Sequence, residues 1–205
     1  EAERLLLEAT QLGHRMGSVN DVSYGQLNLG SCYVRQARYA EAERALAVAL
    51  SGYQKLAMVS FQGETLGHLA EAQRARGELD RARQTAERAL QLESLDPAPT
   101  ALALARLSAI DLSEGLVDDA LEHARSAQEL VQEHGVTEFV GLIARSYVES
   151  LEAAGQGDKA EAALRAAVSW IEAQAAMIDE PVLQRSFLEE VPEHAHLRRR
   201  VSSLR

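Results

Sequence analysis

The chain repeats one pattern of small and apolar residues about every 40 positions. The alanines that mark this pattern are 40, 40, 38 and 40 residues apart; they are Ala2, Ala42, Ala82, Ala120 and Ala160. From the second copy on, a small residue stands five positions before each marker, namely Ala37, Gly77, Gly115 and Gly155. A unit of this length cannot bury its own apolar face. The spacing therefore predicts a stack of similar units.

Each unit has the pattern of two helices joined by a short turn. Apolar residues recur three or four positions apart on both sides of the small residue, which is the helical period. Glycine at the junction permits the left-handed backbone of a tight turn. The first helices of the units are expected at about 22–36, 60–76, 99–114 and 138–154. The second helices are expected at about 1–15, 39–57, 79–93, 117–133 and 158–176.

This pattern resembles the tetratricopeptide repeat (TPR). The family signature is matched best by Leu29, Gly30, Tyr33, Ala42 and Ala49, whereas later copies replace the tyrosine by Gln73, Asp111 and Leu151. A period near 40 is similar to the long-helix variety of the family. The resemblance implies an all-α, right-handed TPR solenoid of stacked antiparallel helix pairs with a C-terminal capping helix.

The resemblance also divides the chain. The solenoid would cover residues 1–176, with a half repeat at 1–18 and repeats at about 21–58, 60–95, 99–134 and 138–176. Residues 177–205 would form a capping helix and a basic tail. Within them, Asp179 and Pro181 favour a helix start, and an apolar stripe predicts one helix over 179–191. We expect its Phe187 and Leu188 to fill a gap beside the last helix of the solenoid.

Composition excludes several classes of function. The chain has 21 basic and 31 acidic residues, for a net charge of −10, so it is not a generic nucleic-acid binder. Its one cysteine, Cys32, cannot form an internal disulfide and is expected to be a buried, unreactive thiol. No apolar run is long enough to cross a membrane. We therefore expect no nucleic-acid partner and no membrane partner.

Catalytic and metal-binding patterns are weak. The six histidines are scattered, and the closest pair, His194 and His196, does not share a helix face and is expected at the surface. Gly155-Gln156-Gly157 is interpreted as the junction of the fourth repeat, since a lone Gly-x-Gly is weak evidence for a phosphate loop. The sequence predicts no enzyme, no cofactor and no metal.

The resemblance to TPR solenoids implies a concave groove lined by the first helix of each unit. The residues nine positions before each junction would point into it; they are Asn28, His68, Arg106 and Ser146. Flanking candidates on the same face are Tyr24, Arg35, Arg74 and Arg145. Arginine and asparagine side chains can anchor the backbone or the carboxylates of a bound peptide.

Two functional hypotheses follow. The first is an interaction module that binds a protein or peptide, or upstream domains of the same polypeptide. The segment 179–194 resembles the closing part of TPR regions in large bacterial signalling proteins, which implies the C-terminal part of a cytoplasmic bacterial regulator. The alternative is a solenoid for self-association through its exposed N-terminal edge, at Leu5, Leu6 and Leu7, with an unused groove.

Overall fold

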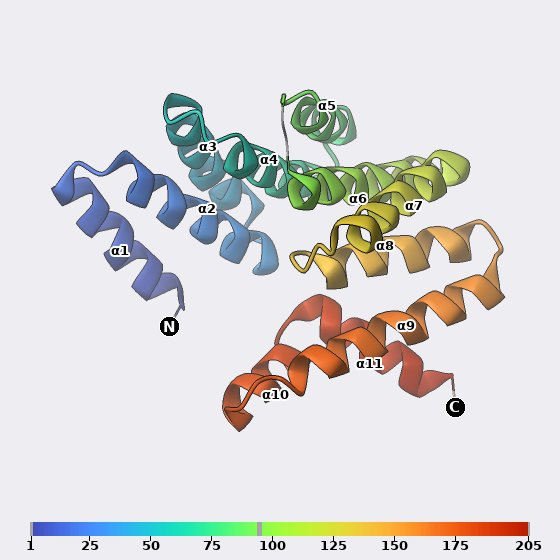
Figure 1. Cartoon of the computed structure of the whole chain (residues 1–205). Helices are drawn as coiled ribbons and strands as arrows, with labels where there is room; N and C mark the ends of the chain where they lie inside the picture. Colours follow the sequence, from blue (N-terminus) through green and yellow to red (C-terminus); the bar gives the residue numbers. More distant parts are fainter. Residues whose placement is uncertain (1, 94–95, 205) are drawn as a thin grey trace.

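The computed structural model describes residues 2–93 and 96–204, and every regular element in these residues is an α-helix. Figure 1 shows the helices in chain order. The first nine are α1 (Ala2–Met16), α2 (Val19–Arg35), α3 (Tyr39–Lys55), α4 (Val59–Ala75), α5 (Leu79–Leu90), α6 (Pro97–Glu114), α7 (Val117–His134), α8 (Val140–Ala153) and α9 (Gly157–Ala175). The last two are α10 (Pro181–Glu189) and α11 (Pro192–Ser203).

The helices stack as consecutive antiparallel pairs. Each helix from α1 to α9 packs on the next one, most extensively in α2–α3 and α6–α7, while α4 also packs on α6 and α6 on α8. The first helix, α1, has no pair partner of its own, and its extensive packing is against α2. The prediction of an all-α solenoid of stacked helix pairs is confirmed, and the helix ends lie within a few residues of those expected from the sequence.

The turn inside each pair has the left-handed backbone conformation that a small residue was expected to permit there. Ala37, Gly77, Gly115 and Gly155 have φ values of 57°, 79°, 80° and 69°. This left-handed region is readily available to glycine and costs energy for other residues. The second helix of each pair begins two residues later, as predicted. Gly155 is thus the junction of the α8–α9 pair.

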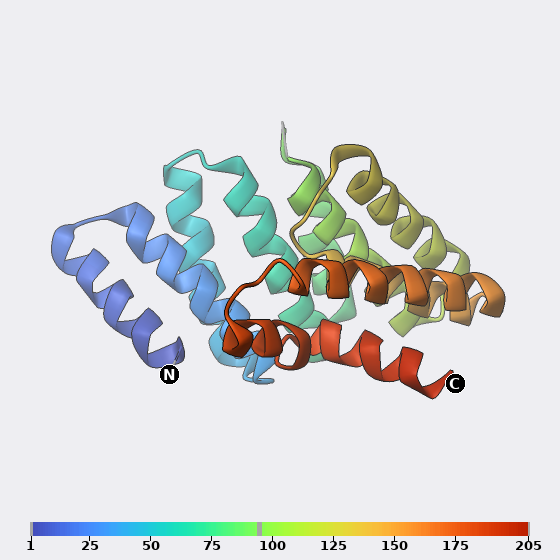
Figure 2. The same cartoon turned by 60° about the horizontal axis from the view of Figure 1, so that its bottom comes forward.

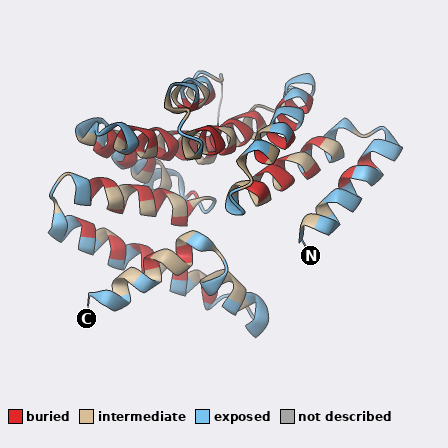
Figure 3. Cartoon of the chain, turned by 180° about the vertical axis from the view of Figure 1, so that it is seen from behind, coloured by how far each residue is buried: buried red, intermediate tan, exposed pale blue. Residues whose placement is uncertain are grey.

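Small residues lie where two helices come closest. Ala42, Ala82, Ala120 and Ala160 are at most 2% exposed, whereas Ala2 is exposed. A Cβ atom on Gly30 would lie only 2.5 Å from Cγ of Leu46 in the neighbouring helix. Figure 3 shows buried residues on the sides of the helices that face one another.

The C-terminal segment departs from the sequence prediction. We expected one helix over 179–191, but the structure has α10 and α11, separated at Glu190 and Val191. Val191 is extended (φ −75°, ψ 113°) because Pro192 disfavours helical backbone in the residue before it. Both helices lie beside α9, as Figures 1 and 2 show.

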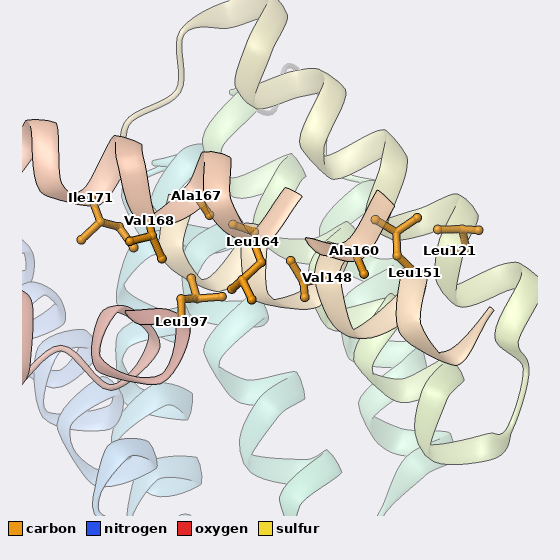
Figure 4. Packing of buried hydrophobic residues seen from close by; sticks show 10 residues of the cluster. Leu121, Val148, Leu151, Ala160, Leu164, Ala167, Val168, Ile171 and Leu197 are labelled. Atoms are coloured by element: carbon orange, nitrogen blue, oxygen red, sulfur yellow. The ribbon is translucent and has the colours of Figure 1, made fainter. Parts of the chain in front are cut away.

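Most of the capping is done by α11, which the sequence analysis did not predict. Leu197 is fully buried and points from α11 toward Leu164 and Val168 of α9 (Figure 4). Phe187 and Leu188 of α10 pack on the same cluster but are only partly buried. Arg200 forms an ion pair with Glu152, and Arg198, Arg199 and Arg200 belong to α11. Arg205 lies outside the described residues.

Two further expectations were wrong. His194 is 7% exposed, because it packs over the backbone of Gly141 in α8, where a side chain would collide with its ring. Cys32 is half-buried, and Gln36 Nε2 lies 3.2 Å from its Sγ. Among the described residues, no helix combines the length and the apolar character that crossing a membrane requires.

Candidate functional site

A cavity of about 640 Å³ lies between the first helices of the pairs and the C-terminal segment. Helices α2, α4, α6 and α8 contribute one side of it. The opposite wall comes from Trp170 of α9, Phe187 of α10 and the start of α11. The C-terminal segment therefore does more than cover the last repeat, because it also forms part of the wall of this cavity.

Six of the eight candidate groove residues line the cavity; they are Arg35, His68, Arg74, Arg106, Arg145 and Ser146. Tyr24 and Asn28 do not line it, because the cavity reaches only the C-terminal turn of α2. The Asn28 amide instead donates to the carbonyl of Tyr24 at 2.8 Å. The side chain of Tyr24 is 55% exposed, with its ring edge toward Phe61.

Glu71 is the centre of a charge network in the cavity. Arg74 donates two hydrogen bonds to its carboxylate, at 2.9 and 3.0 Å, and Arg106 donates one at 3.2 Å. Burial by itself would raise the pKa of Glu71, but the positive charges of Arg106 and Arg74 outweigh this effect and lower it. Glu71 is therefore held in its ionised form.

Arg106 is poorly satisfied for a buried guanidinium. It is 9% exposed, and its bond to Glu71 is its one hydrogen bond within the described part of the chain. Its Nε has no hydrogen-bond partner among those residues. Burial lowers the pKa of Arg106, an effect opposed by the charges of Glu71 and Glu193. A buried cation with unused donors favours the approach of an acceptor.

The other cavity residues have different environments. Ser146 is held inside the packing of α6 on α8, where its hydroxyl lies 2.9 Å from that of Ser108. His68 Nε2 lies 3.8 Å from Glu64 Oε1, and its ring meets Phe139 edge-on. Arg145 donates to Glu149 at 2.7 Å. No hydrogen bond or ion pair of Arg35 is found in residues 2–93 and 96–204.

Sequence reasoning missed the wall opposite these helices. Trp170, Phe187, Glu193 and His194 line the cavity from the last repeat and the C-terminal segment. Pro192 was the available signal, because proline is favoured in the first turn of a helix and indicates that α11 starts there. That signal predicts the helix, but not the surface against which it packs.

The cavity offers arginine donors, carboxylate acceptors and aromatic surface, which are suited to binding. In the part of the chain that the structure describes, no three His, Cys, Asp or Glu side chains come together as ligands for a metal ion.

No family model matches the sequence. No curated protein sequence matches it either. The structure is similar to that of the TPR-like repeats of a kinesin-light-chain-like protein from Podosopora anserina, with a TM-score of 0.54 and 16% identity. The similarity covers 88% of this chain and 93% of that one. The chain has a TPR-type fold. A single-residue variant of the same repeats matches equally well, with a TM-score of 0.54, 18% identity and the same coverage.

Proposed function

We propose that this TPR-type solenoid is a protein-interaction scaffold that binds a peptide or protein segment along its cavity. The cavity crosses four successive first helices, from α2 to α8, so it can contact an extended chain at several points. Helical-repeat stacks commonly provide extended concave surfaces for such contacts.

The observation that carries this proposal is the supply of unused polar groups beside aromatic ones. Arg35 has no ion pair in the described residues, and Arg106 uses one of its donors. Phe139, Trp170 and Phe187 lie on the same cavity. Arginine and aromatic residues contribute most of the binding energy in many protein interfaces.

The bound segment would come from a regulatory partner or from upstream domains of the same polypeptide. The resemblance of residues 179–194 to closing segments in bacterial signalling proteins supports this context. Binding in the cavity could then hold a regulatory domain in one position until the segment is released.

The test is selection of peptides from a random displayed library against the purified chain. Selected peptides are then titrated against Arg35→Ala and His68→Ala, which alter two cavity residues on α2 and α4. We expect at least one variant to weaken binding by about tenfold. Arg88→Ala is the control, because Arg88 is exposed on α5 and lies outside the cavity. Equal binding by all three variants would place the contact surface elsewhere.

Self-association is a second candidate, favoured by an exposed apolar face on α1. Leu5 and Leu12 are each 49% exposed and Met16 is 68% exposed, and their spacing places them on one side of α1. Leu7, which is 41% exposed, lies on another side, and Leu6 packs against the core. Light scattering over a range of concentrations tests this directly. A dimer that is lost in Leu12→Asp would support association through α1, and a monomer at all concentrations would contradict it.

A further inference from the structure

One end of the cavity is formed by the first turn of α8. Phe139 precedes this helix in the left-handed region (φ 59°), with no side-chain cap on the helix. The first three residues of α8, Val140, Gly141 and Leu142, all line the cavity. The N–H groups of a first turn have no partner within their own helix. They also carry the positive end of the helix dipole.

Arg106 is a second and independent feature of the same cavity. Its guanidinium comes from α6, is nine-tenths buried, and has an unpartnered Nε and a single hydrogen bond. Arg145 also lines the cavity, and its positive charge acts on Arg106. One buried cation, a second that is half-exposed, and free N–H groups together form an environment that favours an anion.

The chain already places a carboxylate at this position. Glu193, in the first turn of α11, has its Cβ 3.4 Å from where a Cβ on Gly141 would lie, and its charge acts on Arg106. Glu193 forms no ion pair within the described residues. It is therefore an internal counter-charge that is close to Arg106 without being bonded to it.

The surroundings limit the size and the shape of a ligand. Trp170 and Phe187 form an aromatic wall, and the start of α11 lines the cavity beside them. A cavity of about 640 Å³ is in the range that small-molecule sites occupy. An end of this kind, with aromatic surface beside charged groups, suits a compact molecule with a charged head and an apolar body.

We propose that the end of the cavity between α8 and α11 binds a small organic acid, whose carboxylate meets Arg106 and the start of α8 and whose apolar body contacts Trp170 and Phe187. Glu193 competes with this carboxylate and keeps the site weak when it is ionised. The inference goes beyond the proposed peptide binding and does not depend on it, because the ligand needs only this end of the cavity.

The probe is 3-phenylpropanoate, titrated into the whole chain. Trp170 is the one tryptophan of the sequence, so its fluorescence reports directly on the aromatic wall. Two matched probes separate the contributions: 3-phenylpropanamide keeps the ring without the charge, and acetate keeps the charge without the ring. We expect saturable binding of 3-phenylpropanoate, with both matched probes about tenfold weaker or worse.

Two substitutions should act in opposite directions. Arg106→Met should weaken 3-phenylpropanoate about tenfold or more, because it removes the buried cation. Glu193→Gln should strengthen it about fivefold, because it removes the competing charge. Arg88→Met, on the exposed face of α5, should leave the affinity unchanged. If Arg106→Met does not fold, as judged by its helical circular dichroism, Arg145→Gln provides the same test at a half-exposed position.

Several results would overturn the proposal. One is equal binding of 3-phenylpropanoate and its amide, and another is unchanged affinity in both Arg106→Met and Glu193→Gln. Tighter binding of the tripeptide Gly-Gly-Phe than of 3-phenylpropanoate would show that the site recognises chain ends instead of small acids. None of these results decides the peptide test above, which is read from selected peptides and from Arg35→Ala on α2 as well as His68→Ala.

Discussion

Nδ1 of His123 lies 2.7 Å from Oδ2 of Asp111, whose other carboxylate oxygen accepts a hydrogen bond from Arg83 at 2.6 Å. Asp111 is fully buried, and the three residues join α5, α6 and α7. In the first full repeat the same position is Tyr33, the aromatic residue of the TPR signature. The third repeat has therefore replaced an aromatic contact by a buried charge network.

The first prediction concerns pH. The hydrogen bond to Asp111 is the main reason that the pKa of His123 is raised above 6.5, while burial opposes the rise. Its stabilising effect should be complete below about pH 6.5 and lost as pH rises through the raised pKa. Urea unfolding of the wild type and of His123→Gln should therefore differ most in mild acid and converge in mild alkali. A difference that grows with pH would contradict this assignment.

Removal of the buried carboxylate should cost more than removal of the histidine. Asp111→Ala leaves Arg83 and His123 without their shared acceptor, so we expect a loss of about 3 kcal/mol in the free energy of unfolding. Glu122→Ala, at an exposed position of α7, is the matched control and should change stability by less than about 0.5 kcal/mol. Equal losses in the two variants would mean that the network contributes little.

Gln73 occupies the same repeat position as Asp111 but lacks its partners. It is 4% exposed, and its Oε1 has no hydrogen-bond partner among the described residues. Leu151 fills this position in the fourth repeat and is buried in the core. Gln73→Leu should therefore keep or raise stability, by up to about 1 kcal/mol, since it removes an unsatisfied buried acceptor. Thermal unfolding provides the measurement, and a clear drop in melting temperature would contradict the prediction.

Close approach of α2 and α3 depends on Gly30. Gly30→Ala would force its new methyl group against Leu46, so we expect a loss of about 1–3 kcal/mol. Gly157→Ala is the control, because nothing lies within 4 Å of its added Cβ and alanine favours the helix. Chemical unfolding of the two variants should show changes of opposite sign, or no change for Gly157→Ala.

The C-terminal cap should depend on α11 more than on α10. Leu197→Ala should cost about 2–5 kcal/mol because its side chain is fully buried. Phe187→Ala should cost less, since Phe187 is only partly buried, and Leu183→Ala should be nearly neutral, since Leu183 is 56% exposed. Deletion of residues 179–205 should shift the fluorescence of Trp170 to the red. An unchanged spectrum and melting temperature would show that this segment is not a cap.

The sequence predicted one wall of the candidate site and not the other. His68, Arg106 and Ser146 were placed on one face by their distance from the repeat junctions, and Arg35, Arg74 and Arg145 as flanking positions of that face. All six line one cavity. Their binding role stays a prediction. Asn28 was placed by the same distance and Tyr24 as a flanking position, but the cavity ends before it reaches them. Repeat position determines the direction of a side chain, whereas the extent of a cavity depends on what closes it.

The sequence by itself determined the helices of the repeats, their pairing and the turns between them. These depend on local spacing and on small residues such as Gly77 and Ala82. Only the tertiary structure decided which polar groups meet. Arg83 reaches Asp111 across 28 positions, and Glu193 of the last helix reaches the start of α8. The helical period of the sequence predicts which face of a helix a residue occupies. It cannot state which distant charge that face will meet, because long-range contacts follow from the curvature of the stack and the path of its last two helices.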